Sequence, residues 1–131
     1  MSSGNPVAIV PRKSAGSRVS FLYKIMSKQE WEKVQAHGIY EGSEVDRKDG
    51  FIHLSAAHQV RVTAQKHFSG ITDLVLISIR EESLGPSLKW ETSRGGELFP
   101  HIYGPLQLDA VGESASLPLV NGIHQFPPGL P

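Results

Sequence analysis

The stretch L-V-L-I-S-I, residues 74–79, decides the fold class of this chain, because it is an unbroken run of β-forming residues. Such a nearly continuous apolar run is typical of a central strand that is buried on both faces. Two helical patterns precede it and further strand patterns follow it. The resulting order, βαβαβββ, predicts an α+β domain rather than a doubly wound parallel sheet.

The segments before the first helix and around it have clear local signals. In R-V-S-F-L-Y-K-I, residues 18–25, alternating positions are apolar, which predicts a strand. Ser27 and Glu30 have the spacing of a capping box, and Gly38 is suited to end a helix in the left-handed conformation. A helix is therefore expected between Ser27 and Gly38. The polar residues 42–50 predict a loop.

The sequence from residue 51 to residue 111 predicts the remaining strands and the second helix. F-I-H-L, residues 51–54, predicts a short buried strand, and Ser55 is suited to cap a second helix over residues 56–67. After the central run, L-K-W-E at residues 88–91 and L-Q-L-D-A-V at residues 106–111 predict two more strands, since their apolar residues alternate.

The ends of the chain differ in composition from its middle. Residues 1–18 are rich in Ser, Gly and Pro, which predicts a flexible arm, with residues 7–10 as a piece that could dock in extended form. Residues 19–116 are expected to form one domain. Residues 117–131 contain several prolines and predict an extended tail.

The composition is that of an ordinary soluble protein, with 131 residues, 39% hydrophobic and 20% charged. Thirteen basic residues balance thirteen acidic ones, so the net charge gives no reason to expect nucleic acid or an anionic membrane as the partner. The absence of cysteine excludes disulfides, thiol nucleophiles and cysteine zinc sites. With no apolar run of about 20 residues and no signal-peptide core, the expected location is cytoplasmic.

The first candidate site is D-G-F-I-H-L-S, residues 49–55. His53 lies within an apolar strand, and a helix start follows it closely. The free N–H groups at a helix start suit an anionic ligand group. The alternative is a core histidine that donates to a backbone carbonyl, with Ser55 acting only as a cap.

Two further candidate sites lie in residues 89–106. In K-W-E, an indole beside a carboxylate can stack a ligand ring and bind its hydroxyl groups; the alternative is a strand with one buried tryptophan and a charged edge. In G-G-E-L-F-P-H-I-Y-G-P, glycines and prolines frame Glu97, His101 and Tyr103, and the last two share a face if the segment is extended. The alternative here is an ordinary hairpin loop.

The signatures of several enzyme classes are missing. The chain has no G-x-S-x-G, no H-E-x-x-H and no P-loop. His53, His101 and a carboxylate form a conceivable metal site, since such a set can hold iron or zinc. The other histidines are expected at the surface or at helix ends: His37, His58, His67 and His124.

The combination of D-G-F-I-H-L-S, K-W-E and F-P-H-I-Y-G-P-L resembles the DUF952 family of small uncharacterised proteins, over residues 21–111. The resemblance implies an ADP-ribosyltransferase-like fold, in which split mixed β-sheets with flanking helices surround an NAD-binding cleft. It also implies roles for individual residues. Lys24 or Tyr23 would stand in for the His or Arg of the first strand, His53 and Ser55 for the second-strand group, and Glu91 or Glu97 for the catalytic glutamate.

Three hypotheses follow for the function. In the first, a cleft binds a nucleotide-type or similar small ligand, NAD being the candidate cofactor, with His53 and Glu91 as catalytic residues. The ligand-binding residues would then be Lys24, Ser55, Trp90, Glu97, His101 and Tyr103. In the second, the fold is a binding or interaction module without catalysis, which the missing H-Y-E and R-S-E triads favour. In the third, the chain is a small metal-dependent enzyme that uses the two strand histidines, His53 and His101.

Overall fold

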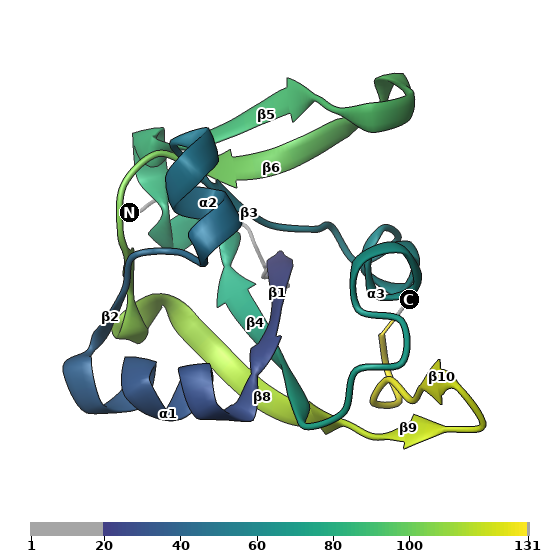
Figure 1. Ribbon diagram of the computed structural model, residues 1–131. Helices are drawn as coiled ribbons and strands as arrows, with labels where there is room; N and C mark the ends of the chain where they lie inside the picture. The colour runs from purple at the N-terminus through teal and green to yellow at the C-terminus, as the bar shows by residue number, and fades with distance from the viewer. Residues whose placement is uncertain (1–19, 131) are drawn as a thin grey trace, which may run out of the picture.

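The computed structural model describes residues 20–130, which form one α+β domain (Figure 1). The three α-helices are α1 (Lys28–His37), α2 (Glu44–Asp49) and α3 (Val60–His67). The strands are β1 (Phe21–Ser27), β2 (Ile39–Tyr40), β3 (Ile52–His53), β4 (Leu74–Arg80), β5 (Leu88–Thr92), β6 (Leu98–Ile102), β7 (Leu106–Gln107), β8 (Val111–Leu117), β9 (Leu119–Val120) and β10 (Ile123–His124). Short 3₁₀ turns join several of them, at Glu81–Ser83, Gly85–Ser87, Arg94–Gly96 and Leu108–Ala110.

The run L-V-L-I-S-I forms β4, the middle strand of a three-stranded sheet with the order β1-β4-β8. Its side chains enter two separate apolar cores. Val75 and Ile77 belong to the core that α1 covers, whereas Leu74 and Leu76 belong to the core that α3 covers. The prediction of a central strand that is buried on both faces is therefore confirmed.

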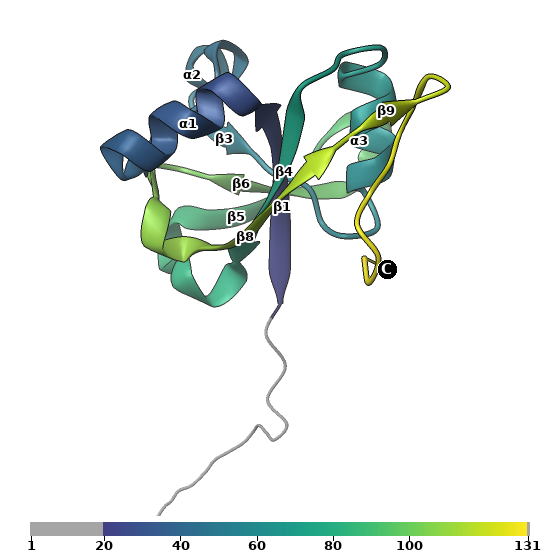
Figure 2. The ribbon, with the colours of Figure 1, turned by 90° about the horizontal axis from the view of Figure 1, so that it is seen from below.

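A second three-stranded sheet has the order β3-β6-β5, and Figure 2 shows it beside the central sheet when the molecule is seen from below. Tyr23 of β1 and Ser55 exchange backbone hydrogen bonds of 2.8 and 2.9 Å, which join the two sheets. Every strand pair in residues 20–130 is antiparallel. The α+β class is confirmed, but the expectation of mixed sheets is wrong for this part of the chain.

The first helix forms where the sequence predicts it. The Ser27 hydroxyl accepts a hydrogen bond from the Glu30 N–H, and Gly38 ends α1 at a φ of 78°. Trp31 and Val34 are buried against the central sheet. None of the helices in residues 20–130 is long and apolar enough to cross a membrane.

The prediction of a loop over residues 42–50 is wrong, because α2 forms there. Ser43 and Asp46 make a reciprocal capping box: the Ser43 hydroxyl accepts from the Asp46 N–H, and the Asp46 carboxylate accepts from the Ser43 N–H. Gly50 then ends the helix at a φ of 90°. These two caps hold a six-residue helix whose composition alone is polar and loop-like.

The second predicted helix is shorter than expected, since α3 begins at Val60 rather than at residue 56. Ser55 is not its cap. Its backbone pairs with Tyr23, and its hydroxyl lies 2.9 Å from the Thr63 hydroxyl. The side chain of Gln59 instead fixes the preceding turn, because its Oε1 accepts from the Ala56 N–H and its Nε2 donates to the Leu98 carbonyl.

The C-terminal segment is more ordered than an extended tail. Leu117 is buried at the end of β8, and β9 and β10 then form a small hairpin. His124 is buried rather than at the surface, and its Nε2 lies 2.8 Å from the Ile71 carbonyl oxygen. Phe126 and Leu130 pack on the α3 core, so residues 118–130 lie against α3. The expected arm over residues 1–18 lies outside the described residues.

Candidate functional site

A buried carboxylate, Asp46, organises the region where α2 meets the two sheets. Its side chain is 2% exposed and accepts hydrogen bonds from five groups, of which the Tyr40 hydroxyl is the most distant. The Lys24 Nζ lies 2.9 Å from Oδ2, and the His53 Nδ1 lies 2.6 Å from Oδ1. The backbone N–H of Ser43 and that of His53 also donate to this carboxylate, at 2.9 and 3.2 Å. Burying the charge is tolerated because it is fully hydrogen-bonded and paired.

The electrostatics of this group follow from its contacts. Burial opposes ionisation of Asp46, but the hydrogen bond from His53 and the charge of Lys24 outweigh it, so the Asp46 pKa lies well below its ordinary value. The neighbouring Tyr40 hydroxyl points at the same carboxylate, 3.4 Å from Oδ2. Burial, Glu30 and Asp46 all raise the pKa of Tyr40, which keeps its phenol protonated.

His53 is held between two carboxylates and is still accessible. Its Nδ1 contacts Asp46, and its Nε2 lies 3.0 Å from Asp49 Oδ2, four residues earlier in the chain. Its side chain is 35% exposed and that of Asp49 is 43% exposed. A carboxylate can only accept, so the hydrogen bond with Asp46 is donated by the His53 Nδ1–H. The Asp46 side is fixed by burial, whereas the Asp49 side is open to exchange with solvent or a ligand.

A second histidine and carboxylate lie on the β5–β6 ladder. His101, which is buried, has its Nδ1 2.7 Å from Glu91 Oε1, and the Tyr103 hydroxyl donates to both oxygens of Glu91 at 2.9 and 3.1 Å. The hydrogen bonds from His101 and then Tyr103 lower the pKa of Glu91. The hydrogen bond between Tyr103 and Glu91 also raises the pKa of Tyr103. Glu91 is therefore an ionised, partly exposed carboxylate whose position is fixed.

Phe51 joins the two histidine–carboxylate pairs into one group. Its ring stacks on His101 at 4.1 Å between centroids and lies 4.7 Å from His53 and 5.3 Å from Tyr103. His53 and His101 are direct partners in the β3–β6 ladder. We call the set of Asp46, Asp49, Phe51, His53, Glu91, His101 and Tyr103 the histidine cluster.

The structure places the other predicted site residues around or away from this cluster. Lys24 donates to the Asp46 carboxylate and to the His53 carbonyl oxygen. Trp90 pairs with Pro100 and lies on the opposite face of the β5–β6 ladder from Glu91. Glu97 contacts His58 at 2.8 Å near the far end of that hairpin. Ser55, described above, is engaged with Thr63.

Asp46, Asp49 and Phe51 were not predicted as site residues. A signal for the first was present, because Ser43 precedes Asp46 by three residues and Gly50 follows, which is the pattern of a short capped helix. Asp49 lies four residues before His53, but that spacing is informative only on a helix. Phe51 looked like an ordinary strand residue. Nothing in one sequence marks the long-range contact of Asp46 with Lys24.

No group of three or more His, Asp or Glu side chains in residues 20–130 is arranged to hold a metal ion. In both strand histidines the Nδ1 atom is already in contact with a carboxylate. His53 and His101, which the sequence offered as metal ligands, are therefore paired with Asp46 and Glu91.

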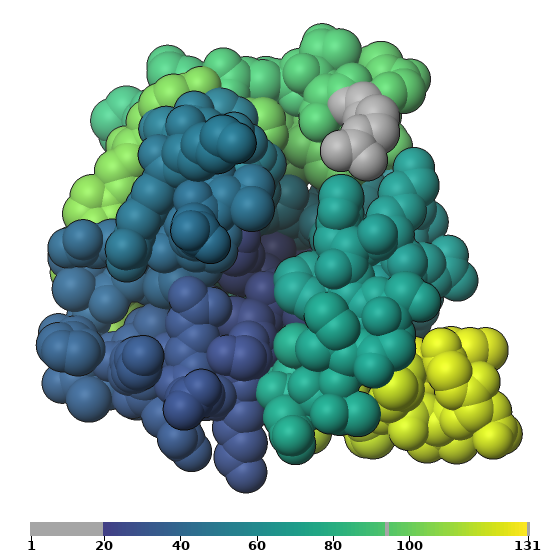
Figure 3. Space-filling view, in the orientation of Figure 1, coloured from purple at the N-terminus to yellow at the C-terminus, as the bar shows by residue number. Residues whose placement is uncertain are grey.

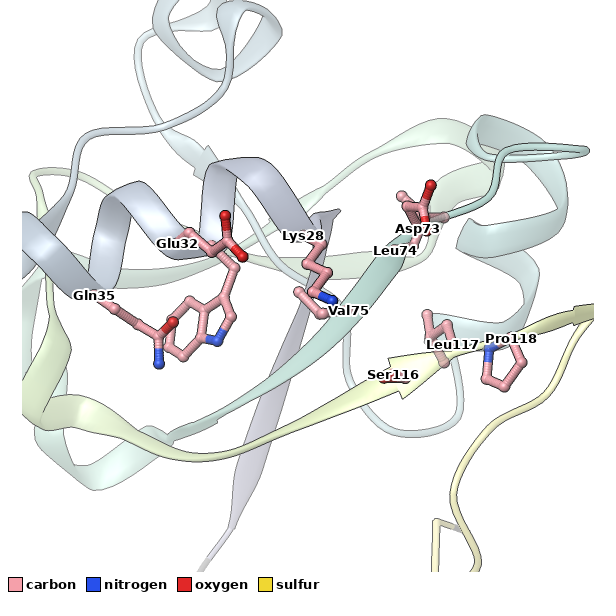
Figure 4. Close-up of a pocket in the computed structure, with 10 residues that line it drawn as sticks. Lys28, Glu32, Gln35, Asp73, Leu74, Val75, Ser116, Leu117 and Pro118 are labelled. Carbon is pink, nitrogen blue, oxygen red and sulfur yellow. The ribbon is translucent and has the colours of Figure 1, made fainter.

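The described part of the molecule has a depression on one face and a separate hollow elsewhere. In the space-filling view, a depression lies between the segments of α2 and α3, beneath the β5–β6 hairpin, with β1 at its floor (Figure 3). A hollow of about 260 Å³ lies elsewhere, between α1, the start of β4 and the end of β8 (Figure 4). None of the histidine cluster lines the second hollow.

Comparisons with known proteins give a family but no activity. Residues 25–114 match the family model described as protein of unknown function (DUF952). The crystal structure of protein CC0527 from Caulobacter crescentus is 50% identical, with a TM-score of 0.78 over 81% of this chain and 94% of that one. Its solution NMR structure gives a TM-score of 0.73 over 80% and 91%. The comparison with curated proteins gave no match. The chain therefore belongs to the DUF952 family, whose function is unknown.

Proposed function

We propose that the histidine cluster binds a small nucleotide-type ligand, and that NAD-dependent transfer of ADP-ribose is the reaction that suits it best. The observation that carries this proposal is that two neighbouring histidines of the β3–β6 ladder are each paired with a carboxylate. His53 and His101 are each fixed through Nδ1 by a carboxylate, at 2.6 and 2.7 Å. Partly exposed side chains of the same cluster, those of His53, Asp49 and Glu91, face solvent.

Glu91 is the residue best suited to meet the reacting part of the ligand. It is ionised, and His101 and Tyr103 hold it in place before any ligand arrives. A fixed carboxylate can accept hydrogen bonds from ribose hydroxyls and stabilise the positive charge that develops when a glycosidic bond breaks. This role matches the catalytic glutamate that the family resemblance assigns to Glu91 or Glu97. Glu97 instead contacts Gln59 and the exposed His58, outside the histidine cluster.

His53 supplies the second polar contact. A ligand hydroxyl or amide that displaces Asp49 would meet the His53 Nε2, while Asp46 keeps the ring in place through Nδ1. A carboxylate-oriented histidine can bind such a group and move a proton to or from it. Phe51 and Tyr103 provide the apolar and aromatic surface next to these groups, the part that the sequence analysis gave to Trp90.

The remaining predicted residues have supporting roles in this proposal. Lys24 fixes Asp46 and the His53 backbone rather than the ligand. Ser55 links the two sheets through its backbone. The lack of the H-Y-E and R-S-E triads and the contact of both His53 nitrogens with carboxylates favour a second candidate function. In it, the cluster binds a ligand and performs no chemistry.

The test is thermal unfolding of the full chain with NAD, ADP-ribose, nicotinamide and AMP. A ligand that binds only the folded chain raises its stability by about 2.7 kcal/mol at a hundredfold excess over its dissociation constant. We expect a shift with NAD or ADP-ribose that Glu91→Gln and His53→Gln both abolish. Glu82→Gln, an exposed residue away from the cluster, is the matched control and should keep the shift.

Two results would separate the candidate functions. Release of nicotinamide from bound NAD would support transfer, whereas a stable complex without release would support the binding module. Wild-type chain that shows no shift with any of the four ligands contradicts both. A shift that persists in Glu91→Gln and His53→Gln would place the ligand outside the histidine cluster.

A further inference from the structure

The hollow beside α1 has no part in the proposed ligand site, and it lies at the edge of the central sheet. Lys28, Trp31 and Glu32 of α1 line one side of it, and Ser116, Leu117 and Pro118 line the other (Figure 4). Its walls are thus both apolar and charged. The hollow lies next to β8, the outer strand of the sheet, so a segment that binds in the hollow could also pair with the edge of β8.

The outer edge of β8 is available for pairing over a short, defined length. Within residues 20–130, β8 pairs only with β4, so its other side offers unpaired N–H and C=O groups. Its first half is irregular: the register shifts opposite Ile77 and Ile79, and the Ser78 hydroxyl bonds both the N–H and the carbonyl of Glu113. Residues 114–117, S-A-S-L, follow in regular register, carry no charge and end at Pro118.

We propose that residues 7–10 of the same chain, V-A-I-V, add to this edge as a fourth strand, antiparallel to residues 114–117. These residues lie outside the described part of the structure, and the inference rests on their sequence. Three of the four are β-branched, and Pro6 and Pro11 bracket them. Prolines are suited to the two ends of an edge strand, because they cannot donate to a ladder. The four-residue run therefore matches the four-residue regular edge.

The chain between this segment and β1 is long enough for the pairing. Ile79 pairs with Leu22 on one side and Val111 on the other, so the starts of β1 and β8 lie two strand spacings apart, about 10 Å. Residues 11–19 span up to about 30 Å when extended. In the antiparallel direction, residue 10 points toward the Val111 end, where β1 also begins. Alternate side chains of the added strand would lie on the α1 face of the sheet, beside the hollow that Trp31 lines.

Charge complementarity favours the same occupant. Residues 1–19 contain three basic residues, Arg12, Lys13 and Arg18, and no acidic one. The rest of the chain therefore has 13 − 3 = 10 basic and 13 acidic residues, a net charge of −3. In the proposed register, Arg12 and Lys13 would follow the added strand past the irregular half of β8, which holds the exposed Glu113.

Amide hydrogen exchange of the full chain tests this proposal. Proline within a strand removes a donor and fixes φ, so Ile9→Pro should prevent the pairing. Ser14→Pro, in the connecting residues, is the matched control. We expect the outward amides of residues 114–117 to exchange about tenfold more slowly in the wild type and in Ser14→Pro than in Ile9→Pro. The amides of β4 should be unchanged in all three, since the fold does not depend on the added strand.

Equal exchange of residues 114–117 in the wild type and Ile9→Pro would overturn the proposal. Protection that increases with protein concentration would also overturn it, because the added strand would then come from a second copy of the chain. Concentration-independent protection that only Ile9→Pro removes supports pairing within one chain.

Discussion

His53 and His101 occupy facing positions on β3 and β6, with ring centroids 5.4 Å apart and ring planes at 70°. Each ring is oriented through Nδ1 by a carboxylate from a different element, Asp46 from α2 and Glu91 from β5. The two carboxylates differ in environment, since Asp46 is buried and Glu91 is partly exposed. Asp46 is thus suited to hold the fold of the site together, and Glu91 to meet a ligand.

Asp46→Asn should destabilise the domain strongly. The amide cannot neutralise Lys24, and it cannot accept from all the groups that now donate to the carboxylate. Removing one partner of a buried ion pair leaves the other charge uncompensated, so we expect a loss of about 3 kcal/mol in the free energy of unfolding. Urea unfolding measured by circular dichroism checks this value.

Asp49→Asn is the matched control for that experiment. Asp49 contacts the same histidine through Nε2, but its side chain is 43% exposed. An exposed pair contributes little, so the loss should stay below about 1 kcal/mol. Similar losses for the two variants would show that burial of Asp46 does not determine the strength of this network.

Acid should weaken the domain through Asp46. Its pKa in the folded chain lies below the ordinary value of 3.8, so near that pH the unfolded chain binds more protons than the folded one. The contribution of Asp46 to stability is therefore complete above about pH 5 and is lost as the pH falls through 3.8 toward the lower folded pKa. Glu91 and Glu97 act in the same direction, because their pKa values are also lowered.

Comparing variants isolates the part that is due to Asp46. In Asp46→Asn, the free energy of unfolding should fall less between about pH 6 and about pH 3 than in the wild type. Urea unfolding measured at steps of about half a pH unit defines the slope for each chain. An equal fall in both chains would assign the acid sensitivity to other carboxylates.

Tyr103→Phe should raise the pKa of Glu91. The Tyr103 hydroxyl now donates to both carboxylate oxygens, and this hydrogen bond lowers the Glu91 pKa. The reciprocal variant, Glu91→Gln, should lower the pKa of Tyr103 toward its ordinary value of 10.0. Carboxyl-carbon NMR titration measures the first change and ultraviolet titration of tyrosine the second. A Glu91 pKa that does not move in Tyr103→Phe would mean that the Tyr103 hydroxyl does not help to lower it.

Much of the fold could be predicted from local patterns, because the signals act within a few residues. The apolar run of β4, the alternation in β1 and the cap at Ser27 each specify an element without help from distant residues. The helix α2 was missed since its apolar content is low and its stability comes from a capping box plus contacts to other elements. The hairpin of β9 and β10 was missed although its turn, Asn121 and Gly122 with φ values of 51° and 79°, is a local hairpin signal.

The candidate site could be predicted only in part. The strand residues His53, Glu91, His101 and Tyr103 were identified from residue type and spacing, and the structure brings them together. The contact of the buried Asp46 with Lys24 could not be predicted, because it joins residues 22 positions apart. Pairing across elements depends on the tertiary fold, and one sequence carries no direct record of it.

Gly42→Ala should disturb the histidine cluster by crowding the side chain of Asp46. Gly42 has a φ of 106°, and a methyl group there would lie 2.8 Å from the Asp46 Cβ and 3.5 Å from Ile52. The carboxylate would have to move away from His53 and Lys24. We expect a loss of about 3 kcal/mol, the sum of left-handed strain and a displaced network.

Gly38→Ala separates these two contributions. Gly38 has a φ of 78°, and an added methyl group meets nothing within 4 Å, so only the strain remains, at about 1 kcal/mol. Urea unfolding gives both losses, and imidazole NMR signals of His53 should shift only in Gly42→Ala. Equal losses with unshifted His53 signals would mean that the backbone near residue 42 yields to the methyl group. The position of Asp46 would then depend on its donors and not on the close approach of Gly42.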